Sequence, residues 1–564
     1  MLRISLFVLA AYSIYALAKG QGQLWIALLS MSLVIFLVVI RVHNNMTEKI
    51  KFIKALIEIN VDEVDFLERK RRPTENGTSF KDALHPYAED LDIFGDNSLF
   101  QFINRTETFP GKLHVANSMK GHLSFEEIQL TQQAVKECTP KINWRQSLMA
   151  QGRVQQDQEL SYNQLIDWSK SDIQPVPLWM RVLSFILPAA LIILVVMYNF
   201  TDLEMYWKLA SFIFTLNLII FSQWLKKIKQ EMPKAEKIHA QLLQYGKLMA
   251  LIEHETWTSE KMKSCQASLQ TQQKSASQLI LKLSSLFERM DSLNNLVGAV
   301  LFNGVGLYHI HVFHTLNQWR QQNSQFLTVW LNTIGEVECI NSLSNLSYNH
   351  PHYCFPTLNQ QANIEYKGLG HPLIPDDKRV NNDISFTQQP FVILTGSNMS
   401  GKSTFLRSLG VNAVLAGMGG AVCAQQANIH PLNLIVSMRL SDSLGENESF
   451  FFAEVKKLKY IMDTLRQGPC FILLDEILRG TNSEDKRNGT ILFLEKLIKL
   501  NAIGVIATHD IEVCKTTDLH PNYLSNQCFE VDLSHQELHF DYTLRQGICQ
   551  NKSATFLMKK MEII

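Results

Sequence analysis

Near its C-terminus the chain reads Phe391-Val392-Ile393-Leu394-Thr395-Gly396-Ser397-Asn398-Met399-Ser400-Gly401-Lys402-Ser403-Thr404. A short apolar, β-rich run leads here into the pattern G-x-x-x-x-G-K-[ST], and a helix-like stretch follows. Gly396 and Gly401 allow the backbone to curl so that successive N–H groups point at phosphate, and the helix N-terminus adds a partial positive charge. The stretch predicts strand, phosphate-binding loop and helix, and with them an α/β nucleotide-binding fold.

The residue types in this loop assign separate tasks. Lys402 is expected to reach the β and γ phosphates of ATP, and the Ser403 hydroxyl to ligate Mg²⁺. The residues predicted to bind ATP are Gly396, Ser397, Asn398, Met399, Ser400, Gly401, Lys402, Ser403 and Thr404.

Two further apolar runs end in polar residues suited to the same reaction. The run at residues 470–474 ends in Asp475 and Glu476. Asp475 suits Mg²⁺, directly or through water, and Glu476 suits a catalytic role in orienting or deprotonating the attacking water. The run at 505–507 is followed by Thr508 and His509. A lone histidine after a strand is usually structural, but the two upstream elements favour a catalytic His509 that senses the γ-phosphate.

Four motifs together resemble one family closely. The loop resembles the G-P-N-M-x-G-K-S-T of MutS proteins, with Ser397 where proline is usual, and Thr508-His509 matches their switch Thr-His. Residues 449–455 resemble the family's S-T-F-x-x-E-M, and residues 475–483 its D-E-I-G-R-G-T-S-T. Weaker similarity extends upstream to the family's helical core and lever, and the whole resemblance covers roughly residues 83–150 and 300–564.

The resemblance implies an ABC-type ATPase in which two subunits sandwich two nucleotides. Ser449 would contact, in trans, the γ-phosphate held by the partner subunit's Lys402, so a homodimer through the ATPase domains is expected, with ATP and Mg²⁺ as cofactors. The chain departs from the family in two places. The N-terminal mismatch-reading domain is expected to be missing, and Asn526-Gln527-Cys528 stands where the family often has N-x-H, whose histidine lies beside adenine.

Four apolar segments, at residues 4–18, 24–40, 182–198 and 207–224, predict two transmembrane helical hairpins. Basic residues follow the first pair and bracket the second, so the positive-inside rule places both turns outside. We therefore expect a multi-pass protein of the inner (cytoplasmic) membrane, in contact with lipid, with the ATPase domain and both termini cytoplasmic. A signal peptide and a buried core pair are the respective alternatives.

Residues 226–345, between the second apolar pair and the nucleotide-binding motifs, carry apolar side chains largely at three-to-four spacing. This spacing predicts long amphipathic helices. His309, His311 and His314 lie in this stretch and are interpreted as packing or surface residues, because their spacing does not place all three on one helix face. The expected domains are a membrane hairpin (1–41), the start of a MutS-like helical core (42–177), a second hairpin (178–225), a helical lever region (226–365) and the α/β ATPase domain (366–564).

The amino-acid composition argues against a dedicated nucleic-acid binder and against a disulfide or zinc framework. Lys plus Arg and Asp plus Glu both number 53, so the whole chain lacks the basic excess of a dedicated nucleic-acid binder. The nine cysteines form no Cys-x-x-Cys pair, which argues against a disulfide framework or a zinc site.

The function expected from these features is an ATP-driven, dimeric conformational switch at a membrane, with DNA left open as a partner. One alternative is the binding of mismatched DNA in DNA mismatch repair proper. Another is a transporter-like membrane ATPase, which the MutS-like signature and the scarcity of charge in the apolar segments disfavour. A scaffold with an inactive ATPase is disfavoured because Lys402, Ser403, Asp475, Glu476 and His509 are all present.

Overall fold

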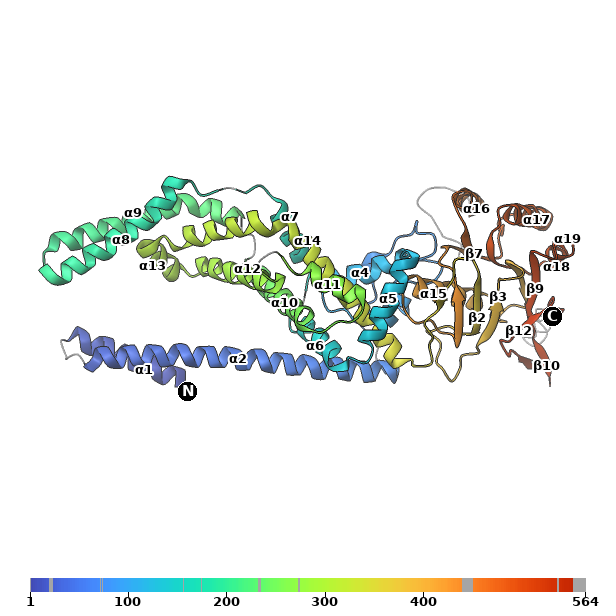
Figure 1. The fold of residues 1–564 in the computed structure, drawn as a ribbon, viewed down its shortest axis with the longest axis horizontal. Helices are drawn as coiled ribbons and strands as arrows, with labels where there is room; N and C mark the ends of the chain where they lie inside the picture. Colours follow the sequence, from blue (N-terminus) through green and yellow to red (C-terminus); the bar gives the residue numbers. More distant parts are fainter. Residues whose placement is uncertain are drawn as a thin grey trace, which may run out of the picture.

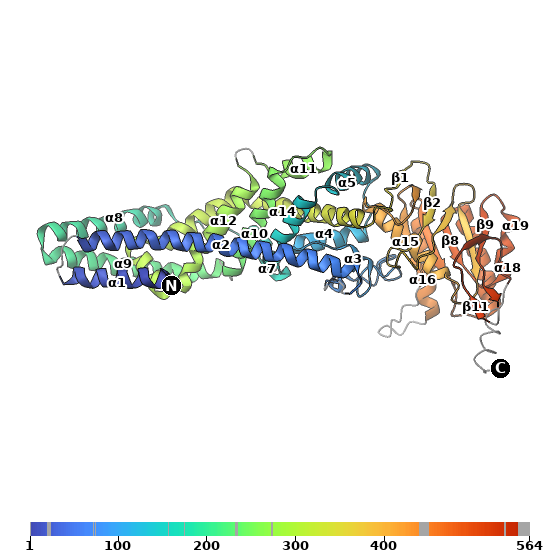
Figure 2. The same ribbon diagram turned by 90° about the horizontal axis from the view of Figure 1, so that it is seen from below.

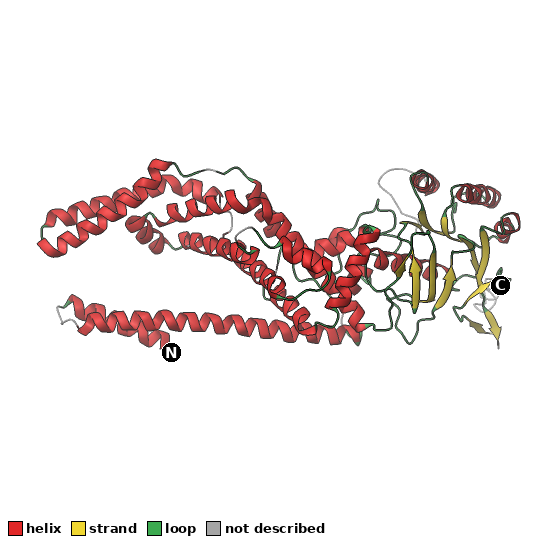
Figure 3. Cartoon of the chain, in the orientation of Figure 1, coloured by secondary structure: helices red, strands yellow, loops and turns green. Residues whose placement is uncertain are grey.

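The computed structural model describes residues 2–19, 24–70, 73, 75–155, 157–173, 175–231, 235–271, 274–438, 450–534 and 537–550. The molecule is elongated (Figure 1). Long helices fill one end, and the strands are confined to the other (Figure 3).

The N-terminal arm is a pair of adjacent helices, α1 (Leu2–Ala18) and α2 (Leu24–Leu67). The 44 residues of α2 contain neither Gly nor Pro, so nothing interrupts the helix where its composition changes from apolar to polar. The boundary expected at residue 41 therefore falls inside α2. Figure 2 shows α2 lying beside α1 and running on to the helices beside the sheets.

The second arm is the hairpin of α8 (Leu178–Thr201) and α9 (Glu204–Glu231). Asp202, with φ 51°, makes the sharp turn between them. Among the described residues, α2, α8 and the 204–229 part of α9 are long and apolar enough to cross a bilayer, whereas the apolar stretch of α1, Ser5–Leu17, is shorter. The boundary expected at residue 225 lies inside α9.

Most remaining helices build a core between the arms and the sheets. Before the second arm come η1 (Thr78–Phe80), α3 (Leu99–Ile103), α4 (Phe109–Lys120), α5 (Phe125–Cys138), α6 (Ile142–Arg153) and α7 (Glu159–Lys170). After it come α10 (Ala235–His254), α11 (Glu260–Ser268), α12 (Ala276–Asp291), η2 (Ser292–Asn294), α13 (Leu296–Gly306) and α14 (Tyr308–Asn349). The predicted long amphipathic helices are present, and α14, the expected lever, spans 42 residues from the second arm to the sheet domain (Figure 1).

The sheet domain contains one six-stranded and one four-stranded sheet. The first has the order β12-β9-β4-β8-β7-β6, in which only the edge strand β12 is antiparallel; its strands are β4 (Phe391–Gly396), β6 (Asn433–Ser437), β7 (Cys470–Asp475), β8 (Ile503–Ala507), β9 (Leu524–Phe529) and β12 (Leu544–Gln546). The second has the order β1-β5-β2-β3, formed by β1 (Thr357–Leu358), β2 (Ile364–Leu369), β3 (Asn382–Ser385) and β5 (Gln426–Ile429). A short hairpin joins β10 (Asp532–Ser534) to β11 (Glu537–His539). The boundary expected at residue 366 falls inside β2.

Successive side chains of the parallel strands point to opposite faces of the large sheet, and helices cover both faces. Val392 and Leu394 join the core that includes α15 (Lys402–Gly417). Phe391 and Ile393 face the opposite core, which includes α16 (Phe450–Leu465) and α17 (Ser483–Lys499). The short helices α18 (Ile511–Cys514) and α19 (Thr516–Leu519) complete the domain. Strands buried on both faces are typical of a parallel α/β sheet.

The segment resembling the start of a MutS core contacts the sheet domain directly. Asp90 accepts from the backbone N–H of Met438 at 2.8 Å and pairs with Lys457 on α16 at 2.6 Å. Asp92 pairs with Arg407 on α15 at 3.0 Å. The helical core is therefore tied to two helices of the sheet domain.

A buried glutamate fixes the lever α14 to the chain before α4. Glu338 accepts from the backbone N–H of Glu107 at 3.0 Å and from the hydroxyl of Thr108. Complete burial raises the pKa of Glu338 from 4.5 to about 7, because the charged form loses its hydration.

We expect Glu338→Gln to stabilise the protein at pH 8 more than at pH 5. Since the folded state binds this proton more tightly than the unfolded state, wild-type stability falls as pH rises from 4.5 to 7, by about 3 kcal/mol for this group alone. Thermal unfolding of the purified variant and wild type at both pH values measures the difference, with the exposed Glu288→Gln as control. A stability difference independent of pH would contradict this prediction.

Candidate active site

The loop between β4 and α15 lines a cavity of about 590 Å³ at the carboxyl ends of the parallel strands. Gly401, with φ 100°, precedes the first residue of α15, and Met399 also has a positive φ of 66°. A side chain on Gly401 would be strained by this conformation, as expected for glycine at this turn. All of the predicted loop residues from Ser397 to Thr404 line the cavity.

Lys402 is buried at the base of the cavity. Its Nζ donates to the carbonyl oxygens of Gly396 at 2.8 Å and Ser397 at 3.0 Å. Burial lowers the pKa of Lys402, because the ammonium loses hydration. This places one cation at the point where the loop would hold phosphate.

The two predicted Mg²⁺ ligands face each other. The Ser403 hydroxyl donates to Asp475 Oδ2 at 2.5 Å. Asp475 is the last residue of β7, and Ser403 lies in the first turn of α15. A hydroxyl and a carboxylate at one point are oxygen ligands of the kind Mg²⁺ prefers.

One polar atom in the loop supports an anionic occupant. Ser400 Oγ is buried and has no hydrogen-bond partner among the described residues. Buried hydroxyls are normally satisfied, so a phosphate oxygen at this position would supply the missing acceptor. The residues present therefore fit ATP and Mg²⁺.

Glu476 and His509 also line the cavity and contact each other. His509 Nε2 lies 2.8 Å from Glu476 Oε1 and 3.3 Å from Lys402 Nζ. The hydrogen bond with His509 holds the pKa of Glu476 at about 2, so its carboxylate is ionised at neutral pH. The sequence predicted both residues, and the contact between them is a new observation.

The turn after Glu476 is held by a residue to which the sequence assigned no role. Glu476 and Leu478 have positive φ values of 48° and 59°, which side-chain-bearing residues adopt at a cost. Glu454 on α16 accepts from the backbone N–H groups of Leu478 at 2.5 Å and Arg479 at 3.1 Å. The Arg479 side chain donates to the carbonyl oxygens of Asp475 and Glu476. The only signal for Glu454 was its place in the motif at 449–455.

Aromatic side chains also line the cavity and offer a surface on which a nucleotide base could stack. Tyr542 and Phe529 line the cavity, and a β-carbon on Gly401 would come within 3.0 Å of the Tyr542 ring. Cys528, in the position of the family's adenine-contacting histidine, is buried on β9 and does not line the cavity. Tyr542 belongs to none of the motifs, so the sequence offered no signal for it.

Ser449, predicted to act in trans, lies outside the described residues. The structure places the other predicted residues together: Gly396 at the end of β4, the loop, Asp475, Glu476 and His509.

Comparison with known proteins identifies the sheet domain. The family model for MutS domain V matches residues 392–562. The human MutS protein homolog 4 is 31% identical over 194 residues, which are 32% of this chain and 20% of that protein. The DNA mismatch repair protein MutS of Thermotoga petrophila is 30% identical over 218 residues, 38% of this chain and 27% of its own length.

The similarity to these curated relatives thus spans about a fifth to a quarter of their length. The match to the family model lies in the ATPase-related α/β domain, which follows an α-rich region in this chain. The chain therefore contains a MutS domain V, and over that part it is similar to proteins of the MutS family.

Proposed function

We propose that this protein is a membrane-anchored, Mg²⁺-dependent ATPase that acts as a dimeric, ATP-driven conformational switch. One observation carries the proposal: Lys402, Asp475 and Glu476, together with Ser403 and His509, converge on a single cavity from the ends of three neighbouring parallel strands.

In the proposed reaction, Lys402 gives up its contacts with the loop carbonyls and pairs with the β and γ phosphates. Ser403 and Asp475 would hold Mg²⁺, which supplies positive charge against the developing phosphate charge. Ionised Glu476 accepts a hydrogen bond from the attacking water and orients it, while His509 fixes the Glu476 carboxylate.

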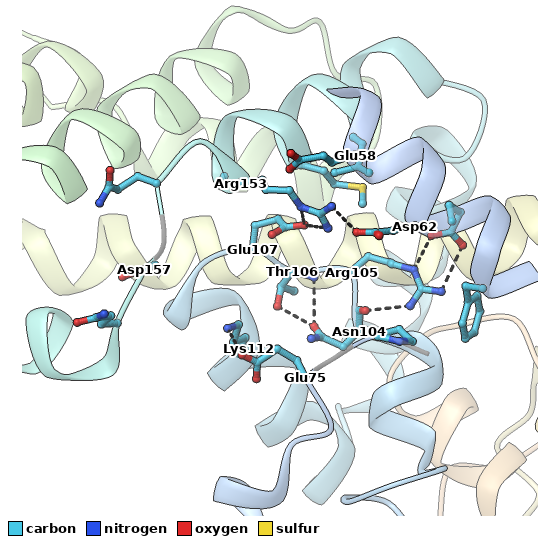
Figure 4. Close-up of a pocket in the computed structure, with 18 residues that line it drawn as sticks. Glu58, Asp62, Glu75, Asn104, Arg105, Thr106, Glu107, Lys112, Arg153 and Asp157 are labelled. Carbon is cyan, nitrogen blue, oxygen red and sulfur yellow. Dashed lines mark hydrogen bonds and ion pairs between the residues drawn. The ribbon is translucent and has the colours of Figure 1, made fainter. Parts of the chain in front are cut away.

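An ion-pair network provides a route from the lever to the membrane arm (Figure 4). Arg105 pairs with Glu63 on α2 at 2.6 Å, and Arg153 on α6 bridges Asp62 of α2 and Glu107, each at 2.6 Å. These residues line a second cavity, of about 560 Å³. Because the backbone of Glu107 is bonded to Glu338 on α14, a movement of the lever would pull on α2.

The membrane part of the proposal rests on exposed apolar side chains on both arms. Many large apolar side chains on the two arms are exposed, among them Phe7, Leu37, Phe185 and Phe212. Contiguous apolar surface of this extent marks a membrane or protein contact. The length of α2, α8 and α9 favours a bilayer.

The proposal is tested by expressing the full chain and fractionating the cells. The protein is expected to stay in membranes washed with alkaline carbonate, and the purified protein in bilayers to hydrolyse ATP only with Mg²⁺. Release by carbonate would contradict the anchor, and absence of hydrolysis would contradict the ATPase. Tight, salt-sensitive binding of labelled DNA duplex would instead favour the mismatch-repair alternative suggested by the relatives' names.

A further inference from the structure

The helix α13 (Leu296–Gly306) lies beside the second arm and is bent by 86° from the lever α14, which follows after one residue. Figure 1 shows this short helix next to the α8–α9 hairpin, where the lever begins. The sequence places it in the cytoplasmic lever region.

The two faces of α13 are the reverse of those of a helix in a soluble protein. Its buried face is small and polar, formed by Ala299, Asn303 and Gly304. Its outer face carries large apolar side chains: Leu296 is 77% exposed and Val297 67%, and the others are Val300, Leu301, Phe302 and Val305. Exposure of this face to water would be strongly unfavourable, at about 25 cal/mol for each Å² of apolar surface.

The C-terminal end of α13 packs against the middle of α9 in the second arm. Asn217 on α9 donates to the carbonyl oxygen of Gly304 at 2.9 Å, and the Gly304 backbone lies against the Phe214 ring. Asn217 precedes the basic end of α9, at Lys226, by nine residues, or about 14 Å along the helix axis. That distance is close to half of a hydrocarbon core of about 30 Å.

The break between α13 and α14 is satisfied as the interior of a membrane requires. Asn303 is fully buried, accepts from the backbone N–H of His309, and its amide contacts the carbonyl oxygen of Ala299 and His309 Nδ1. The other ring nitrogen of His309 bonds with Ser292. A broken helix is tolerated at membrane depth only where the freed polar groups find such partners.

The charged residues around α13 are also distributed as expected for a helix in a membrane. Residues 292–319 contain no Asp, Glu, Lys or Arg. Exposed basic residues instead stand at the ends of the neighbouring helices, at Arg289 on α12 and at Lys226 and Lys227 on α9, as expected beside lipid headgroups.

We propose that α13 is buried in the cytoplasmic leaflet of the bilayer, with its Leu296, Val297 and Leu301 face against lipid acyl chains, so that the lever α14 begins inside the membrane. The inference rests on the proposed membrane anchor and extends it. The lever of the ATPase would then be coupled to the bilayer at its own first turn, in addition to its indirect link to α2 through Glu107 and Arg153.

The test uses the full chain in lipid nanodiscs with a nitroxide label on a single introduced cysteine. Val297→Cys and Leu301→Cys report on α13, and Ile193→Cys reports on the exposed face of α8. Leu84→Cys, at a side chain that is 95% exposed between η1 and α3, reports on water. Collision rates with oxygen and with a water-soluble nickel chelate are measured for each label. The unsubstituted chain gives the background from the nine native cysteines.

The α13 labels are expected to give an oxygen-to-nickel ratio like that of Ile193→Cys and at least about fivefold above that of Leu84→Cys, because the polar chelate is excluded from hydrocarbon. Nickel access at Val297→Cys and Leu301→Cys, with Ile193→Cys protected, would overturn the inference and leave the anchor intact. Nickel access at all four positions would overturn the anchor as well. Unchanged ATP hydrolysis by each labelled protein confirms that it is folded.

Discussion

Lys402→Ala is expected to lower ATP turnover by about 100-fold, because the loss of a charged hydrogen bond to phosphate costs about 3 kcal/mol. The ammonium is held by two loop carbonyls, so the substitution removes a positioned and partly desolvated charge. Hydrolysis by the purified variant, together with the binding of a fluorescent ATP analogue, measures the effect.

The matched control is Lys515→Ala. Lys515 is an exposed lysine of the same domain that pairs with Glu512 and does not line the cavity. This variant is expected to retain wild-type turnover. Equal hydrolysis by wild type and Lys402→Ala would mean that the ATP site lies elsewhere.

Glu476→Gln is expected to bind ATP normally and to hydrolyse it about 10²- to 10³-fold more slowly, within the range for removal of a general base. The amide preserves the shape of the side chain and still offers an oxygen to His509 Nε2, so the local fold should persist. Because the ionised carboxylate is lost, the water is no longer oriented or deprotonated. ATP should then accumulate in the closed state and hold two subunits together.

Light scattering or crosslinking in the presence of ATP measures this dimer. The control, Glu512→Gln, changes an exposed glutamate on α18 and should hydrolyse ATP at the wild-type rate. A Glu476→Gln protein that binds ATP and stays monomeric would count against the shared site.

The sequence predicted the strands of the site well. Residues 391–394, 470–474 and 505–507 are purely apolar and end in polar turns, and the structure contains β4, β7 and β8 at these positions. Since parallel strands end at one edge of a sheet, Lys402, Asp475 and His509 were expected near one another, and they line one cavity. Motif spacing was sufficient here because local geometry determines the site.

Contacts between distant segments could not be predicted in this way. Tyr542 lies between β9 and β12 in the sequence, and the fold brings it against Gly401. Glu454 supports the turn after Glu476 from another helix. Hydropathy also detects only the apolar part of α2 and gives no indication that the helix continues to Leu67. The apolar face of α13 has the composition of a core helix, and only the structure reveals that it is exposed.

The measurement that tests the central claim most directly is the distance between two copies of a spin label on the cytoplasmic part of α2. Ile57, 58% exposed, is a suitable position, and the Glu476→Gln protein in nanodiscs keeps ATP unhydrolysed. ATP with Mg²⁺ is expected to shift the distance distribution, and the shift should vanish in a Lys402→Ala background and weaken when Arg153→Ala breaks the bridge from Glu107 to Asp62. An unchanged distribution in a protein that demonstrably binds ATP would contradict an ATP-driven switch coupled to the membrane arm.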